Sequence, residues 1–258
     1  MADWKRGLRR VLYPAYEARV VRRLPGDKIP QHVGVMLDGN RRWAKAVGAD
    51  TAQGYRAGAA NIEPLLEWCE EVGVKVVTLW LLSTDNLNRP AEELGGLLQI
   101  IENAVGSLAE QHRWRLHPVG ALDLLPDSTA RKLKAAADTT RDVDGLLVNV
   151  AVGYGGRREI ADAVRALLQD QAAKGMTIEE LAEVLDVEHI AEHLYTRGQP
   201  DPDLVIRTSG EQRLGGFLLW QSAHSEFYFC EAYWPEFRRV DFLRAIRAYA
   251  QRERRYGA

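Results

Sequence analysis

Cysteine is scarce in this sequence, and long hydrophobic runs are absent. Only two cysteines occur among 258 residues, Cys69 and Cys230, and they stand far apart and outside any CxxC pattern. A disulfide scaffold is therefore excluded, and we expect a reduced, cytoplasmic location. The main apolar runs, residues 74–82 and 146–152, are far shorter than the ~20 residues of a membrane-spanning helix. The charged first residues are followed by no apolar core or cleavage site, so we expect no secretory signal.

Charge is nearly balanced overall but unevenly distributed along the chain. The 34 Lys and Arg residues against 36 Asp and Glu give a net charge of −2, and the hydrophobic content of 46% is ordinary for a globular protein. Residues 1–28 nevertheless carry eight basic and three acidic side chains, and residues 236–258 carry seven and three. Such ends are either interaction surfaces or solvated tails. We expect residues 1–28 to form a basic helical segment, which either lies on an anionic membrane surface or packs on the domain formed by residues 29–258.

Apolar runs and helical patterns alternate along the rest of the chain. Strands are predicted near residues 32–38, 74–82, 145–152, 203–207 and 226–233, the second and third as the nearly continuous apolar runs of strands buried on both faces. Helices are predicted from residue 39, over 57–71, from Pro90 to Leu108, over 157–173 and over 239–255. This alternation favours a single α/β domain in which helices surround a central parallel β-sheet of about six strands.

Polar and basic residues follow three of these strands, at the sheet edge where parallel sheets bind ligands. The first strand ends at Asp38, whose carboxylate could hold a divalent ion, and the helix start and arginines that follow could hold a phosphate. A solvated turn with Asp38 as helix cap is the alternative for this segment alone. Two further strands are followed by residues 83–90 and 207–213. The three strand ends supply Arg41, Arg42, Arg89, Arg207 and Arg213, which indicates more than one phosphate.

Three other patterns leave alternatives open. The helix that contains residues 57–66 is rich in small and apolar residues, and its apolar face either belongs to the core or lines a cavity for a hydrocarbon tail. Residues 153–156, GYGG, follow a strand as a dinucleotide-binding turn does, but they do not form GxGxxG. His189 and His193 lie four residues apart without HExxH, which favours a surface helix face over a zinc site.

Five motifs resemble those of a known enzyme family. They read HVGVMLDGNRRWAK, LSTDNLNRP, NVAVGYGGRREI, DLVIRTSGEQRLGGFLLWQ and SEFYFCEAYWPEF. Together with the terminal RERRYG, they are similar to motifs of the cis-prenyltransferases, the undecaprenyl diphosphate synthase family. The resemblance extends from Ile29 to Gly257. The DDxxD motif of the all-helical trans-prenyltransferases is absent. The resemblance implies condensation of isopentenyl diphosphate with an allylic diphosphate to form a new Z double bond. It also implies a Mg²⁺-dependent homodimer (with Mn²⁺ as an alternative ion) whose subunits contain a hydrophobic tunnel.

The resemblance also implies residue roles. Asp38 is similar to the aspartate that acts with Mg²⁺ on the diphosphates, Asn86 to a residue that assists proton removal, and Glu226 to a second Mg²⁺-associated carboxylate. The implied substrate-binding residues are Gly39, Asn40, Arg41, Arg42 and Trp43 on the allylic side, Tyr55, Ser83, Thr84, Asp85, Leu87 and Arg89 along the substrate region, and Arg207, Arg213, Leu214 and Gly215 around isopentenyl diphosphate.

Several positions depart from the family pattern. Tyr55 stands where the family usually has a histidine that touches diphosphate, and Thr51 stands in place of an arginine just upstream. Gly215 replaces a common serine, and Leu87 replaces a frequent tryptophan. These differences concern the allylic side above all.

Product length is the other expectation. Long-chain members commonly have a small residue where this chain has Leu81, next to Leu82, and a leucine that points into the tunnel would stop chain growth early because a packed wall absorbs extra volume poorly. We therefore expect (2Z,6E)-farnesyl diphosphate, made from geranyl diphosphate. Leu81 as ordinary strand core is the alternative.

Two other functions remain alternatives to a short-chain enzyme. One is a medium- or long-chain synthase that makes decaprenyl or undecaprenyl diphosphate. The other is a non-catalytic partner subunit, and the presence of Asp38 and Asn86 argues against it. Nucleic-acid binding is not expected, because the basic ends lack interleaved aromatic residues. The basic N-terminus adds the expectation of a peripheral contact with the inner face of the cell membrane.

Overall fold

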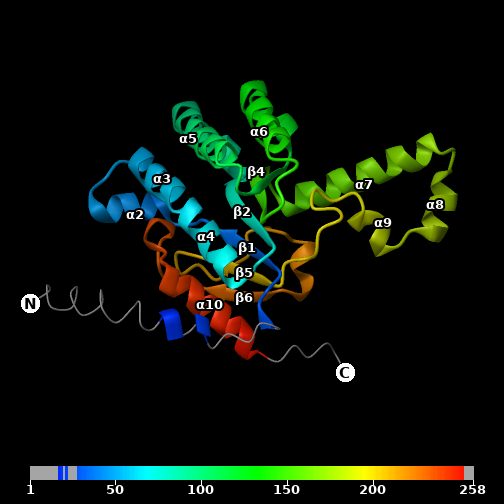
Figure 1. Cartoon of the computed structure of the whole chain (residues 1–258). Helices are drawn as coiled ribbons and strands as arrows, with labels where there is room; N and C mark the ends of the chain where they lie inside the picture. The colour runs from blue at the N-terminus through cyan, green and yellow to red at the C-terminus, as the bar shows by residue number, and fades with distance from the viewer. Residues whose placement is uncertain (1–16, 20, 23–27, 253–258) are drawn as a thin grey trace, which may run out of the picture.

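The computed structural model describes residues 17–19, 21–22 and 28–252, and within them six parallel strands form one sheet (Figure 1). The strands are β1 His32–Met36, β2 Val76–Ser83, β3 Arg115–Val119, β4 Leu147–Tyr154, β5 Leu204–Arg207 and β6 Glu226–Phe229. Their order across the sheet is β3-β4-β2-β1-β5-β6. The predicted α/β class with about six parallel strands is confirmed.

The sheet buries both faces, which explains the continuous apolar runs. Val35 of β1, Leu79 of β2 and Val150 of β4 face a large core formed with helices α4 Ile62–Val72, α5 Ala91–Glu110, α6 Asp127–Thr139 and α10 Arg239–Gln251. The alternate residues Met36 and Ala151 face a smaller core that contains Tyr154, Phe217 and Leu218. Side chains alternate between the faces of a strand, so a strand covered on both sides must be apolar throughout.

Two short helices lie beside the end of β1, namely α2 Asn40–Val47 and α3 Thr51–Ala60. The single helix predicted over residues 57–71 is wrong, because the chain breaks at Asn61 between α3 and α4. The Asn61 side-chain amide donates to the carbonyl oxygens of Trp234 and Phe237, both at 2.9 Å, so this break is fixed by the segment before α10. Short 3₁₀ segments are η2 Asp85–Asn88, η3 Leu122–Leu124, η4 Gln221–His224 and η5 Trp234–Glu236.

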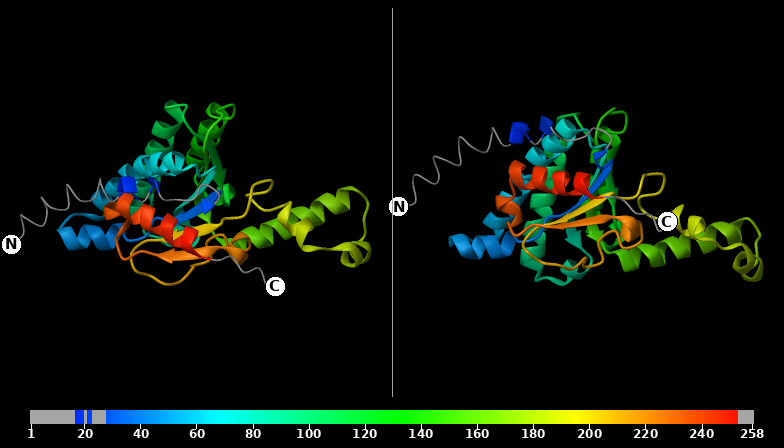
Figure 2. Two further views of the ribbon diagram at one scale, coloured as in Figure 1. Left: turned by 60° about the horizontal axis from the view of Figure 1, so that its bottom comes forward. Right: turned by 90° about the horizontal axis from the view of Figure 1, so that it is seen from below.

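An arm made of three helices extends away from the sheet (Figure 2). It consists of α7 Gly156–Ala173, α8 Ile178–Val184 and α9 Val187–Ala191, of which only α7 is predicted from the sequence. His189 lies in α9 and His193 just after it, and no cluster of three or more potential metal ligands occurs in the part of the chain that the structure describes.

Most of the predicted basic N-terminal helix lies outside the described residues, as does nearly all of the terminal RERRYG. The described residues 17–19 and 21–22 are helical, and Val21 packs against the main core. The Glu17 carboxylate accepts a hydrogen bond of 2.8 Å from Arg239 of α10. The end of the segment thus packs on the domain, and its membrane contact stays a prediction. Within the described ranges, no helix combines the length and apolar character needed to cross a bilayer.

Candidate active site

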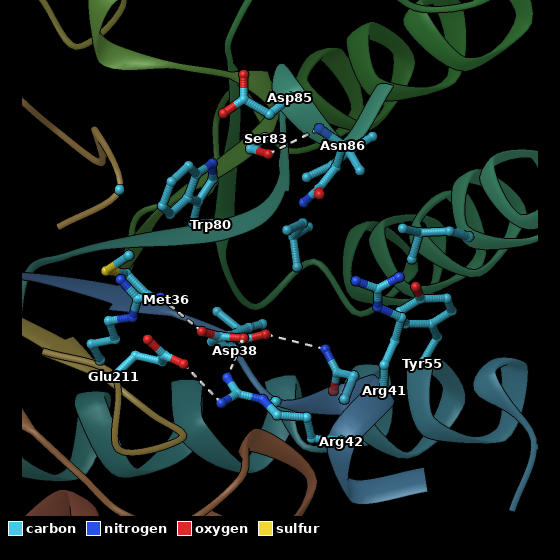
Figure 3. Close-up of a pocket in the computed structure, with 18 of the residues that line it drawn as sticks. Met36, Asp38, Arg41, Arg42, Tyr55, Trp80, Ser83, Asp85, Asn86 and Glu211 are labelled. Atoms are coloured by element: carbon cyan, nitrogen blue, oxygen red, sulfur yellow. Dashed lines mark hydrogen bonds and ion pairs between the residues drawn. The ribbon is translucent and has the colours of Figure 1, made fainter. Parts of the chain in front are cut away.

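A pocket of about 600 Å³ opens where the carboxyl ends of β1, β2 and β5 meet (Figure 3). β1 lies between β2 and β5, so the chain leaves β1 toward one side of the sheet and later returns on the other. Such a switch point leaves a crevice between the connections, and parallel sheets bind ligands there. The three predicted strand ends do come together at this edge.

Most of the predicted site residues line this pocket. They are Asp38, Gly39, Asn40, Arg41, Arg42, Tyr55, Leu81, Leu82, Ser83, Asp85, Asn86, Arg89, Arg207, Arg213 and Gly215. Met36, Leu37, Trp80, Leu97 and Glu211 line it as well and are not predicted from the sequence. The four apolar ones belong to segments that are predicted as strands or as a helix, so only their position at the pocket is new. Glu211 is the exception, and its place between two predicted arginines in the sequence is the signal that could have found it.

The turn after β1 depends on a glycine. Gly39 has φ +106°, and a Cβ atom there would approach Tyr233 Cδ1 to 2.8 Å. Only glycine adopts this conformation readily and leaves room for Tyr233. The turn leads directly into α2, whose first residues line the pocket and include no acidic side chain, so the first N–H groups of α2 lie at the helix end beside the pocket. These groups and the helix dipole favour an anion at this position.

Asp38 is held between two arginines. Its Oδ2 accepts a hydrogen bond of 2.9 Å from Arg207 Nη2, and its Oδ1 accepts one of 3.3 Å from Arg42 Nη2. Burial alone would raise the pKa of Asp38, but the hydrogen bond and charge of Arg207, together with Arg42 and Ser209, outweigh it and keep that pKa below its ordinary value. Asp38 is therefore an ionised carboxylate at neutral pH.

The arginines of the pocket are also paired with Glu211. Its carboxylate lies 3.0 Å from Arg42 Nη1 and 3.2 Å from Arg213 Nη2. The Arg42 guanidinium further donates to Ser209 Oγ at 2.7 Å, and the chain holds Ser209 at φ +77° through a backbone hydrogen bond to Ala232. A guanidinium with five N–H donors can keep such contacts and still bind a phosphate oxygen.

A small apolar cavity adjoins the pocket. Its volume is about 30 Å³, and Tyr55, Leu81 and Leu97 line both spaces. This apolar space is small, and the hydrophobic tunnel that the resemblance implies stays a prediction. Gly58 and Ala59 of α3 border the cavity, whereas Leu65 and Leu66 of α4 belong to the core. The α4 part of this helical region is therefore core, and a cavity for a hydrocarbon tail beside α3 stays a prediction.

Leu81 reaches the cavity because β2 is irregular there. Trp80 pairs with Ala151 and Leu82 with Val152, so Leu81 is an extra residue in the β2–β4 ladder. Gly153 is the extra residue on β4 one position later, which restores the register. Such a bulge turns a side chain away from the regular alternation. Leu81 is half-buried, whereas Leu82 is 1% exposed in the core.

The structure does not bring every predicted residue to the pocket. Trp43, Thr84, Leu87 and Leu214 are chain neighbours of lining residues but do not line it. Glu226 is farther away: it begins β6, where it pairs with the first residue of β5, and its carboxylate forms an ion pair with Arg252. Parallel strands end at the pocket and begin at the opposite edge. Glu226 therefore lies outside the pocket that Asp38 lines, and its role as a second Mg²⁺-associated carboxylate stays a prediction.

Comparisons with known proteins point to the same family as the site. A chain of Streptomyces avermitilis called isoprenyl transferase 1 is 63% identical over 97% of both chains. The (2Z,6E)-farnesyl diphosphate synthase of Thermobifida fusca is 66% identical over 97% of this chain and 99% of that one. The crystal structure of lavandulyl diphosphate synthase from Lavandula x intermedia, in complex with dimethylallyl diphosphate, matches with a TM-score of 0.83 and 32% identity, covering 90% of this chain and 100% of that one.

A family model described as putative undecaprenyl diphosphate synthase matches residues 36–257. That range contains every residue that lines the pocket. Together with relatives that are more than 60% identical over nearly the whole chain, this match assigns the family without the need for any single motif. The chain belongs to the undecaprenyl diphosphate synthase family and is a cis-prenyltransferase.

Proposed function

We propose that this enzyme condenses isopentenyl diphosphate with geranyl diphosphate and releases (2Z,6E)-farnesyl diphosphate. The observation that carries the proposal is the junction of the two spaces: a pocket with five arginines adjoins an apolar cavity of only about 30 Å³. The pocket has the charge to hold two diphosphates, and the cavity has little room for a growing chain. The relatives named (2Z,6E)-farnesyl diphosphate synthase support the same product.

Magnesium fits this pocket as a partner of the substrate. Asp38 supplies an ionised carboxylate, and the described residues contain no cluster of three or more ligands that could cage an ion by themselves. Mg²⁺ is usually held by one or two carboxylates together with phosphate oxygens and water. Bound there, the ion would neutralise diphosphate charge and so make diphosphate a better leaving group.

The chain's own residues account for the remaining steps of the proposed reaction. One carbon–carbon bond forms between C4 of isopentenyl diphosphate and C1 of the allylic substrate, while the bond from C1 to diphosphate breaks and diphosphate leaves with its electron pair. The arginines at the three strand ends stabilise the charge that develops on that group. A proton then leaves C2 of the new unit and passes to the released diphosphate, and we assign Asn86, which lines the pocket, to assist this transfer.

The two alternatives fit the molecule less well. A decaprenyl or undecaprenyl synthase needs space for a long hydrocarbon. Here the small apolar cavity lies where that space would begin, and the side chains of Leu81 and Leu97 line it. A non-catalytic subunit does not need an ionised Asp38 held between two arginines in a pocket that Asn86 also lines.

One incubation series tests the proposed function. Purified protein with Mg²⁺ and labelled isopentenyl diphosphate receives geranyl, farnesyl or geranylgeranyl diphosphate as the allylic primer. We expect geranyl diphosphate to give (2Z,6E)-farnesyl diphosphate as the dominant product, identified by chromatographic chain length and double-bond geometry. If none of the three primers leads to incorporation of label, the enzyme proposal is contradicted. Products of ten or eleven isoprene units would contradict the short-chain assignment.

We also propose a homodimer that uses the α7–α9 arm. Apolar side chains are exposed along it, namely Leu168, Ile178, Val184, Leu185 and Val187, and Ile178 is 75% exposed. A protruding apolar patch of this kind marks an interaction site. Sedimentation equilibrium should give twice the chain mass of 29.0 kDa, and Ile178→Glu should shift it toward the monomer. Leu124→Glu, at an exposed leucine outside the arm, serves as the control. A monomeric wild-type protein at micromolar concentration would refute the dimer.

A further inference from the structure

Tyr55 of α3 lies at the border between the polar pocket and the apolar cavity. It lines both spaces, and only 7% of its surface is exposed. Figure 3 shows Tyr55 and Arg41 on the same side of the pocket, across from Glu211. Tyr55 is one of the positions that depart from the family pattern, so its role cannot be taken from the resemblance and has to come from its contacts.

Those contacts connect Tyr55 to a carboxylate and an arginine. The Tyr55 hydroxyl donates a hydrogen bond of 2.6 Å to Glu93 Oε1, and Arg89 Nη1 donates one of 2.6 Å to the Tyr55 oxygen. The Arg89 guanidinium also lies 5.7 Å from the centre of the Tyr55 ring, within the range of a cation–π contact. One tyrosine thus holds Arg89 by its ring and by its hydroxyl.

Glu93 extends this group to a second arginine. Its Oε1 lies 3.5 Å from Arg89 Nη1 and 3.7 Å from Arg41 Nη1. The Arg89 side chain is 16% exposed and the Glu93 side chain 26%, so this pair is largely shielded from water. The Arg41 side chain is 57% exposed, and its contact with Glu93 is correspondingly weak. Glu93 therefore fixes Arg89 firmly and Arg41 loosely.

The arrangement is directed at the pocket rather than at the core. Arg41 and Arg89 both line the pocket, and Arg89 uses only part of its five-donor guanidinium on Tyr55 and Glu93. The three charges of the group sum to +1, which suits a diphosphate at the mouth of the apolar cavity. Burial and the hydrogen bond to Glu93 raise the pKa of Tyr55 to about 12, so the hydroxyl keeps its proton and its donor role throughout the neutral range.

We propose that Tyr55 and Glu93 are positioning residues: they hold Arg89, and more loosely Arg41, at the border of the two spaces, where these arginines receive the diphosphate of the allylic substrate. This inference rests on the proposed function and deepens it. Tyr55 acts on the substrate by positioning Arg89. Removal of the Tyr55 hydroxyl should therefore weaken binding of the allylic substrate and leave the isopentenyl diphosphate site, formed by Arg207 and Arg213, intact.

A double-mutant cycle with Tyr55→Phe and Glu93→Gln tests this role. Tyr55→Phe keeps the ring and removes one oxygen atom, and Glu93→Gln keeps the shape and removes the charge. We expect each variant to raise the KM for geranyl diphosphate about tenfold, the size of a lost hydrogen bond to a charged group, and to leave the KM for isopentenyl diphosphate within twofold. Because both residues act through Arg89, the KM of the double variant for geranyl diphosphate should not exceed that of the more impaired single variant.

Glu92→Gln is the matched control, because Glu92 is the exposed neighbour of Glu93 on the same helix. It should leave both KM values unchanged. A fall in melting temperature with unchanged KM values would overturn the inference and leave a purely structural role, as would an equal rise in both KM values. If Glu93→Gln does not fold, Tyr55→Phe alone carries the same test. Failure of the wild-type protein to use any allylic diphosphate would refute the proposed function instead, before any variant is compared.

Discussion

Asp38→Asn is expected to lower kcat by roughly 10²–10³-fold, the usual effect of removing one group that stabilises transition-state charge. Asparagine keeps the shape of the side chain but loses the charge that holds Arg207 and Arg42 in place. It also removes the ionised oxygen that suits Mg²⁺. Initial rates at saturating substrates, measured over a range of Mg²⁺ concentrations, give the effect on turnover.

The control for this change is Asp123→Asn, at an aspartate whose side chain is 69% exposed and pairs with Arg158 outside the pocket. It should leave turnover unchanged. Because Arg207 loses its partner in Asp38→Asn, circular dichroism should accompany the rates to show that the variant is folded. A folded Asp38→Asn enzyme with turnover within a few-fold of wild type would remove Asp38 from the proposed mechanism.

Leu81→Ala is expected to change the product itself, to chains at least one isoprene unit longer. The substitution deletes three carbon atoms from the wall that the pocket and the apolar cavity share. Since Leu81 is only half-buried, we expect the free energy of unfolding to fall by about 1–2 kcal/mol, less than for a leucine deep in a core. Reversed-phase chromatography of products from geranyl diphosphate measures the change in length.

Leu82→Ala provides the matched comparison. Leu82 lies next in the sequence but is 1% exposed, packs in the main core and does not line the apolar cavity. Its truncation should cost about 2–5 kcal/mol of stability and leave product length unchanged. Unchanged product length in Leu81→Ala, or equal lengthening in both variants, would show that Leu81 does not limit the chain.

The sequence predicts those parts of the fold that are buried on both sides. β2 and β4 lie inside the sheet, so nearly every side chain must be apolar, and the run is visible without further information. β3 is an edge strand that contains Pro118, and such a strand needs neither a continuous apolar run nor a complete set of N–H donors. It therefore escapes prediction, as do the short helices α8 and α9 of the arm.

The pocket is predictable for a related reason. All strands are parallel, so the residues after β1, β2 and β5 must meet at one edge, and the arginines there can be read from the sequence. Glu226 begins its strand and so lies at the opposite edge, a position that the motif alone does not reveal. Glu93 and Glu211 show another limit: each also pairs with an arginine far away in the sequence, Glu93 with Arg41 and Glu211 with Arg42, and only the folded chain reveals these two pairings.

The bulge in β2 has a consequence for how such an enzyme can evolve. Leu81 is the one residue of the strand that has no counterpart in the ladder with β4, and Gly153 restores the register directly afterwards. A substitution at Leu81 therefore disturbs neither the pairing of the strands nor the positions of Ser83 and Asp85 beyond it. We therefore expect substitutions at this position to change product length while the residues that line the diphosphate pocket stay in place.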